Sequence, residues 1–140
     1  MDIVQQLKRE EGVRPSAYQD QFGYWTIGVG RLIDARKGGG LTEDEIDYLL
    51  MNDIRQKTAE VRAALPWFDT LNDARKAVLV GMAFQMGTAG LLGFKQTLAA
   101  VRDERYANAA GLMLQSSWAK QTPGRANRMA RQMETGEWQT

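Results

Sequence analysis

The stretch from Ala17 to Ile33 restricts the possible folds of this chain more than any other segment. It is rich in aromatic and β-branched residues and is interrupted by Gly23, Gly28 and Gly30, a pattern typical of short antiparallel strands joined by tight turns. Apolar residues at helical spacing precede this stretch and resume soon after it. The sequence therefore predicts an α+β fold that is mostly α-helical and contains one small sheet.

A first helix is predicted before the sheet. Ile3, Val4 and Leu7 follow helical spacing toward Glu11, and Gly12 is expected to stop the helix. Glu11 is then placed at the helix end, close to where the sheet begins.

A second, longer helix is predicted after the sheet. A flexible connection through Gly38-Gly39-Gly40 leads to Thr42–Glu45, which has the form of a capping box. The helix that begins there is expected to run to about Ala64, because Pro66 marks its end.

The rest of the chain is helical in pattern. The segments concerned are 72–86, a short one around Leu91, 96–103, 106–115 and 123–134. Thr122 is a suitable N-cap for the last of them, with Pro123 at its first position.

The length and composition are those of one domain. The chain has 140 residues, of which 44% are hydrophobic, enough for a single core. We expect one domain over residues 1–140 with an N-terminal lobe of about residues 12–60 that carries the sheet. A long connecting helix leads to a C-terminal lobe of about residues 65–140, which also takes in helix 1–11.

The chain contains neither cysteine nor histidine. These absences exclude disulfide bonds and catalysis by Ser-His-Asp or Cys-His groups, and they argue against zinc. We therefore expect no metal and no other cofactor, so carboxylates are left to carry acid–base chemistry.

Charge is unevenly distributed along the chain. Residues 1–70 hold 9 Lys/Arg against 12 Asp/Glu, whereas residues 71–140 hold 9 against 5. The basic half is either a solvated helix surface or a surface for an anionic polymer.

No basic leader precedes an apolar run at the N-terminus, and the longest apolar run, Ala77–Phe84, is too short to span a bilayer. We expect a monomer made in the cytoplasm, without a nucleic-acid partner or stable membrane insertion.

Two carboxylates and a hydroxyl flank the predicted sheet: Glu11, Asp20 and Thr26. Cleavage of a glycosidic bond needs a proton donor for the leaving oxygen, and a carboxylate or a water on the other face of the sugar. Shielding from water favours a protonated carboxyl group, so Glu11, near the predicted lobe junction, is expected to be the acid. Asp20, on an exposed turn, is expected to stay ionised. Thr26 would hold the attacking water, which gives inversion if the carboxylates are roughly 6.5–9.5 Å apart.

The surroundings of these residues resemble the signature of the phage-type lysozymes, the muramidase family known from T-even phages. The resemblance extends over nearly the whole chain. The motifs that carry it are Glu10-Glu11-Gly12, Tyr18-Gln19-Asp20, Gly23-Tyr24-Trp25-Thr26-Ile27-Gly28-Val29-Gly30, Phe84-Gln85-Met86-Gly87, Gly93-Phe94, Trp118, Gln121-Thr122-Pro123-Gly124-Arg125-Ala126 and Thr135-Gly136-Glu137-Trp138.

The resemblance implies a two-lobed lysozyme fold and a glycoside hydrolase. Glu11 would be its general acid, Asp20 its second carboxylate and Thr26 the residue beside the water. The implied reaction is hydrolysis of the β-1,4 bond between N-acetylmuramic acid and N-acetylglucosamine in bacterial peptidoglycan, with inversion. The implied setting is an endolysin that stays in the host bacterial cytoplasm until a holin permeabilises the membrane, and then lyses the cell.

The resemblance also implies residues that contact the sugar. These are Leu32, Phe84 and Thr97, of which Thr97 replaces a serine of the family. An asparagine of the family is Leu112 here, so a polar contact is lost or is supplied by Gln115.

Two charged pairs are implied as supporting groups. Arg125 would pair with Glu11, and Arg31, which stands where the best-known member has histidine, would pair with Asp53. The second pair would not titrate near neutral pH.

The segment Gly28-Val29-Gly30 lacks the residues of a phosphate loop and is expected to serve a tight turn or a close backbone approach.

Three alternatives remain open at this point. The first is a lytic transglycosylase, which uses one glutamate and forms an anhydro sugar. The second is a peptidoglycan-binding module without turnover, and the third is the lysozyme part of a phage tail or of an engineered fusion. The presence of Glu11, Asp20 and Thr26 together favours hydrolysis.

Overall fold

The computed structural model describes residues 2–33 and 39–139. They divide into two compact units, Met1–Leu49 and Leu50–Thr140. The boundary falls inside the long helix α2 (Glu43–Ala64), and each unit is described by itself. Residues 34–38, including Gly38 of the expected glycine connection, lie outside the described part. The assignment of helix 1–11 to the C-terminal lobe stays a prediction.

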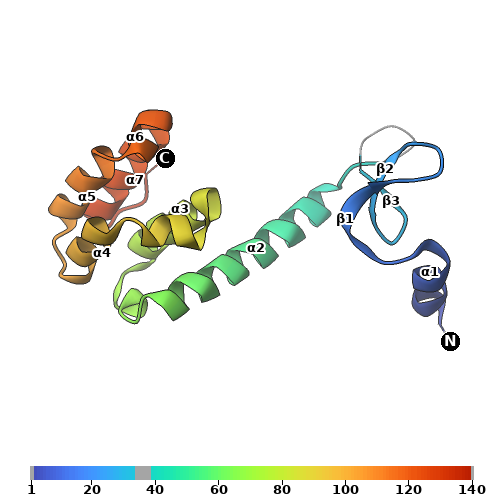
Figure 1. The fold of residues 1–140 in the computed structure, drawn as a ribbon. Coiled ribbons are helices and arrows are strands. Elements are labelled where there is room, and N and C mark those ends of the chain that lie inside the picture. The colour runs from blue at the N-terminus through green and yellow to red at the C-terminus, as the bar shows by residue number, and fades with distance from the viewer. Residues whose placement is uncertain (1, 34–38, 140) are drawn as a thin grey trace. The chain divides into compact units, whose positions relative to one another are not determined.

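The N-terminal unit begins with helix α1 (Ile3–Glu11). The side chain of Asp2 caps it by accepting a hydrogen bond of 2.9 Å from the backbone N–H of Gln5. Gly12 ends the helix with a φ of 79°, a conformation that favours glycine, and this confirms the predicted end. Within this unit, α1 lies beside the sheet (Figure 1).

The sheet has three antiparallel strands in the order β1 (Arg14–Gln19), β2 (Trp25–Gly28) and β3 (Arg31–Leu32). The predicted region began only at Ala17, because Pro15 and Ser16 are weak strand formers. Pro15 is tolerated because β1 is an edge strand, and the register is irregular between Arg14 and Tyr18.

The register of the sheet separates two faces. Thr26 pairs with Tyr18 on one side and with Leu32 on the other, so these three side chains share a face. Ile27 pairs with Arg31, and both lie on the opposite face. Thr26 is only 3% exposed, so its face is the better covered of the two at this point.

Helix α2 starts at the predicted capping box. The backbone N–H of Thr42 donates to Glu45 Oε1 at 2.9 Å, and the backbone N–H of Glu45 donates to the Thr42 hydroxyl at 3.3 Å. The helix ends before Pro66, as predicted.

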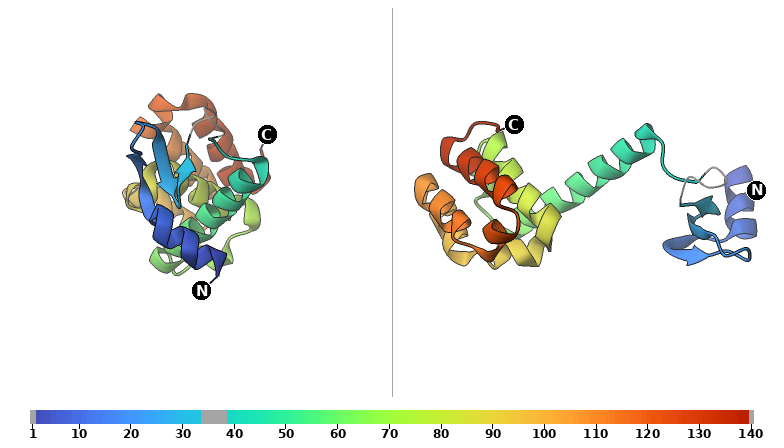
Figure 2. Two further views of the ribbon diagram at one scale, coloured as in Figure 1. Left: turned by 90° about the vertical axis from the view of Figure 1, so that its right-hand side faces the viewer. Right: turned by 90° about the horizontal axis from the view of Figure 1, so that it is seen from above.

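The second unit is helical throughout the described residues. After α2 come η2 (Phe68–Thr70), α3 (Asp73–Leu92), α4 (Lys95–Arg102), α5 (Tyr106–Leu114), α6 (Ser117–Gln121) and α7 (Pro123–Thr135). Helices α5 and α7 pack side by side, with α4 against α5, α6 against both, and α3 against α7 (Figure 2). Their core contains the fully buried side chains of Val61, Phe68, Val78, Leu79, Met82, Leu91, Val101, Met113 and Met133.

Helix α3 is interrupted where the sequence predicted a gap. Gly87 has φ 82° and ψ 157°, which is not helical, so a helix up to Met86 and a short segment around Leu91 are both confirmed.

Among the described residues, no single helix has the length and apolarity to cross a membrane. The bent pair α3 and α4, at 101° to each other, meets that test by length and composition alone.

Thr122 is the N-cap residue of α7, as predicted, but its side chain does not cap the helix. Its hydroxyl donates to the carbonyl of Trp118 at 3.0 Å, and no side chain caps α7. The reason is the short helix α6, which the sequence did not predict and which ends immediately before Thr122. The carbonyl of Trp118 in α6 accepts both the backbone N–H of Thr122, at 2.9 Å, and its hydroxyl. Pro123 does begin α7, as expected.

Candidate active site

Glu11 is the last residue of α1, and its carboxylate lies over Gly30. A Cβ atom built on Gly30 would be 2.9 Å from Glu11 Oε2 and 3.1 Å from Cδ. A side chain at this position would displace the carboxylate from its place, and the φ of 68° at Gly30 also favours glycine. The expected close backbone approach in Gly28-Val29-Gly30 is thus confirmed at its last residue.

The N-terminal unit itself does not shield Glu11 from water. The residue is exposed, although the sequence analysis expected shielding to keep the acid protonated. Glu11 is the last residue of α1, and neither α1 nor the sheet buries its side chain. The role of Glu11 as the acid stays a prediction.

Asp20 follows β1 and is held by the turn that leads to β2. Its Oδ1 accepts hydrogen bonds of 2.9 Å from the backbone N–H groups of Phe22 and Tyr24. Its own backbone N–H donates to the carbonyl of Tyr24 at 2.8 Å. Asp20 is half-buried, and these contacts fix the direction of its carboxylate.

Thr26 is tied to the same residue. Its hydroxyl donates to the carbonyl of Tyr24 at 3.0 Å, so Asp20 and Thr26 are both hydrogen-bonded to Tyr24. A hydroxyl whose proton is used in this way still has lone pairs that accept a hydrogen bond from water. The turn therefore fixes the carboxylate and the hydroxyl relative to each other.

Both carboxylates border one hollow on the N-terminal unit. This hollow has a volume of about 570 Å³, and its lining residues are Glu11, Arg14, Tyr18, Gln19, Asp20, Gln21 and Phe22. The hairpin thus places Asp20 at the same hollow as Glu11. Two carboxylates that border one hollow are the groups that cleavage of a glycosidic bond needs.

The sequence analysis missed Arg14. Its guanidinium lies 4.7 Å from the centre of the Tyr18 ring, a cation–π distance, and it borders the same hollow as the two carboxylates. A basic residue three positions after Glu11 was visible in the sequence. The sequence did not show that Arg14 lies beside the two carboxylates. The structure shows this, because β1 begins at Arg14, just after the end of α1.

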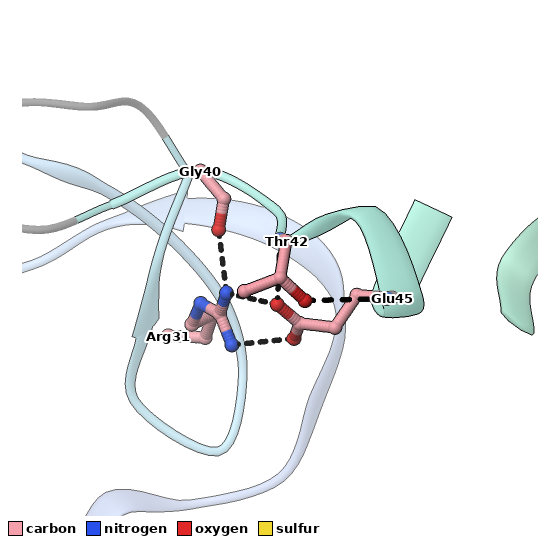
Figure 3. Close-up of polar contacts among 4 residues, drawn as sticks. All are labelled: Arg31, Gly40, Thr42 and Glu45. Atoms are coloured by element: carbon pink, nitrogen blue, oxygen red, sulfur yellow. Dashed lines mark hydrogen bonds and ion pairs between the residues drawn. The ribbon is translucent and has the colours of Figure 1, made fainter. Parts of the chain in front are cut away.

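Arg31 pairs with a different carboxylate from the one the sequence analysis named. Its Nη1 and Nη2 each lie 2.6 Å from an oxygen of Glu45, and Nη2 also donates to the carbonyl of Gly40 at 2.5 Å (Figure 3). The predicted partner, Asp53, belongs to the other unit, where it borders a hollow with Phe84. Glu45 is the partner within the N-terminal unit because the first turn of α2 brings it to the end of β3. A contact between Arg31 and Asp53 stays a prediction.

The Arg31–Glu45 pair shifts the titration of both groups. The pKa of Glu45 is lowered to about 2, first by the hydrogen bond from Arg31 and next by the one from the backbone N–H of Thr42. The hydrogen bond to Glu45 in turn raises the pKa of Arg31. Arg31 thus has a partner, Glu45, whose pKa lies far below neutral pH.

The remaining predicted site residues lie in two hollows of the second unit. Phe84, 45% exposed, and Arg125 border a cavity of about 490 Å³ beside α2 and α3, where Arg125 Nη2 donates to the carbonyl of Gly81 at 3.2 Å. Thr97 is 4% exposed and borders a hollow of about 430 Å³ with Leu112 and Gln115.

Several predicted contacts stay predictions. They are the sugar contacts of Leu32, Phe84 and Thr97, the pairing of Arg125 with Glu11, and a supporting role for Asp53. Leu32 does lie on the same sheet face as Thr26.

Within the described residues, no group of three or more acidic side chains is arranged to hold a metal ion.

Comparison with known proteins agrees with this arrangement. Residues 8–134 match the sequence profile of the family described as "Phage lysozyme". A "Probable T4-type lysozyme 1" of Dictyostelium discoideum is 31% identical over 161 aligned positions, which cover 96% of this chain and 94% of that protein. The "Pre-baseplate central spike protein Gp5" of Enterobacteria phage T4 is 29% identical over 97% of this chain and 28% of its own length.

A third relative is the "Peptidoglycan hydrolase gp36" of Pseudomonas phage phiKMV. It is 30% identical over 91% of this chain and 14% of its own length. The family match spans most of the sequence and includes the hollow with its two carboxylates. This chain belongs to the phage lysozyme family.

Proposed function

We propose that this protein is a muramidase that hydrolyses the β-1,4 bond between N-acetylmuramic acid and N-acetylglucosamine in bacterial peptidoglycan. The observation that carries the proposal is the shared hollow of Glu11 and Asp20, next to Thr26 on the buried face of the sheet. The family supports a lysozyme, and the name of the phiKMV relative supports peptidoglycan as the substrate.

Each group has a distinct part in the proposed reaction. Glu11 donates its proton to the oxygen of the leaving sugar. Asp20 acts as the base, and the two backbone N–H groups that donate to its Oδ1 fix the direction of its carboxylate. Thr26 accepts a hydrogen bond from the water that Asp20 orients and deprotonates. Attack by this water from the opposite face of the sugar inverts the configuration at the cleaved carbon.

The biological setting is part of the same proposal. As an endolysin, the protein would act without a cofactor and as a monomer. It would stay in the host bacterial cytoplasm until a holin opens the membrane, and would then cause lysis of the host. The similarity to the phage T4 spike protein favours one other setting, in which the same reaction is part of a phage particle.

The test is turnover of purified peptidoglycan by the wild type, Glu11→Gln and Glu10→Gln. Glu11→Gln keeps the size of the side chain but removes its proton-donating carboxyl group. Glu10→Gln is the matched control, because Glu10 is exposed, pairs with Arg9 at 2.9 Å and does not border the hollow. The released fragments are identified by mass spectrometry.

The proposal predicts new reducing muramic acid ends from the wild type and from Glu10→Gln. Glu11→Gln should lose this activity by at least about a hundredfold, the usual lower range for loss of a general acid. Anhydro ends would instead identify a lytic transglycosylase. Binding to peptidoglycan without any released fragment would identify a recognition module and would rule out the catalytic roles.

A further inference from the structure

The side chain of Arg31 joins the last strand of the sheet to the first turn of α2 (Figure 3). Both of its terminal nitrogens engage Glu45, one oxygen each at 2.6 Å, and Nη2 also reaches the carbonyl of Gly40. Glu45 is itself held by the N–H of Thr42 at 2.9 Å. A bidentate pair between two anchored groups fixes direction as well as distance.

The strand that Arg31 holds is very short. Strand β3 consists of Arg31 and Leu32 only, and it lies at the edge of the sheet. Two residues supply few backbone hydrogen bonds, and such a strand has little stability of its own. Beside its pairing with β2, backbone hydrogen bonds join Ile33 N–H to the carbonyl of Trp25 at 3.0 Å and Gly40 N–H to the carbonyl of Leu32 at 3.2 Å. The contact of Arg31 with Glu45 adds a side-chain attachment of β3 to the first turn of α2.

The neighbours of Arg31 in the chain belong to the candidate active site. Gly30 comes directly before it and receives the carboxylate of Glu11, and Leu32 comes directly after it and pairs with Thr26. Arg31 lies on the opposite face of the sheet and, with Glu45, borders a different hollow from the one that contains Glu11 and Asp20. Arg31 therefore holds β3 from the face of the sheet opposite to Thr26 and Leu32.

We infer that Arg31 and Glu45 are positioning residues that keep Gly30 under the carboxylate of Glu11 in the orientation for proton donation. The inference rests on the proposed function. Neither residue touches the substrate, because the pair acts through the backbone of β3. Breaking it lets Gly30 move and changes the place of the acid, which slows the chemical step more than it weakens substrate binding.

The experiment measures kcat and KM on soluble peptidoglycan fragments at a temperature where circular dichroism shows every variant to be folded. Arg31→Met and Glu45→Gln each break the ion pair. Glu45→Gln keeps a side-chain oxygen that accepts the N–H of Thr42, so the capping box is retained. We expect kcat to fall roughly tenfold to a hundredfold, the range for a displacement of up to about 1 Å, with KM changed less than about twofold.

A conservative variant and two controls separate positioning from stability. Arg31→Lys keeps the charge but offers one point of contact in place of two, so its kcat should be intermediate. Thr42→Ala removes the helix cap and leaves the ion pair, so it should lower the melting temperature and keep the wild-type kcat. Arg102→Met breaks a similarly exposed pair, with Asp103 at 3.0 Å in the second unit, and should also keep it.

Two results overturn the inference. One is an unchanged kcat in Arg31→Met and Glu45→Gln, together with normal turnover by the wild type. The other is an equal loss of kcat in Thr42→Ala, because this would show that only the stability of the helix start matters. A wild type that cleaves no peptidoglycan bond would instead overturn the proposed function, and this inference with it.

Discussion

A methyl group at position 30 would act directly on Glu11, the proposed catalytic acid. Ordinary contacts of a Cβ atom begin at 3.4 Å, whereas a Cβ at Gly30 would lie 2.9 Å from Glu11 Oε2. The carboxylate must therefore retreat by about 0.5 Å, the difference between these two distances. Because it is the end of an exposed, flexible side chain, it can move at little cost to the fold. Gly30→Ala should consequently affect catalysis more than stability.

Gly28 provides a matched control on the same turn. Its φ is 69°, close to the 68° of Gly30, but a Cβ there meets no atom within 4 Å. Both alanine variants adopt a left-handed conformation, which costs about 1 kcal/mol, and both regain part of this because alanine has less freedom in the unfolded chain. Urea unfolding should show a similar, small loss of stability in the two variants.

Only Gly30→Ala should lose activity. A displacement of this size at a proton donor is expected to lower kcat by about tenfold, since 1 Å can cost about a hundredfold. The assay is kcat on soluble peptidoglycan fragments for the wild type, Gly30→Ala and Gly28→Ala. If Gly30→Ala keeps the wild-type kcat, or if Gly28→Ala loses as much, the position of the Glu11 carboxylate over Gly30 is not what sets the rate.

Three further predictions concern pH, product and stability. The pKa of Glu45 is lowered from 4.5 to about 2, so its pairing with Arg31 stabilises the fold above pH 4.5 and this contribution fades as the pH falls toward 2. The melting temperatures of the wild type and Glu45→Gln should converge over that range, and a constant gap contradicts this. Proton NMR of the first product should show the α-anomer, as inversion requires, and the β-anomer excludes it. Arg75→Ala should cost about 2 kcal/mol in urea unfolding, because Arg75 donates to two carbonyls at the end of α7 at 2.8 and 2.9 Å and lies 3.5 Å from the Tyr106 ring. A loss below about 0.5 kcal/mol contradicts that role.

Local signals predicted most of the helices and the sheet. Gly12 at the end of α1, the capping box at Thr42–Glu45 and Pro66 after α2 each act through the backbone of a few neighbouring residues. Helices η2 and α6 are too short to show a hydrophobic period, so they were missed. The side chain of Thr122 was expected to cap α7 because α6, to which its hydroxyl donates, was missed.

The site was less predictable where it depends on residues distant in sequence. Glu11, Asp20 and Thr26 were found because they lie in a compact motif with turn signals between them. The partner of Arg31 was not, because several carboxylates follow β3 and only the direction of the chain into α2 selects Glu45. The sequence indicated a close approach at Gly28-Val29-Gly30, but only the structure identified Gly30 as the position and Glu11 as the group that approaches it.

The most direct test of the central claim is digestion of peptidoglycan by the wild type in water enriched in ¹⁸O. Hydrolysis by a water held between Asp20 and Thr26 predicts one ¹⁸O atom at the reducing carbon of each new muramic acid end, detected by mass spectrometry. Ends that carry an anhydro ring and no ¹⁸O would contradict the account, because the sugar's own hydroxyl, and not water, would then be the nucleophile.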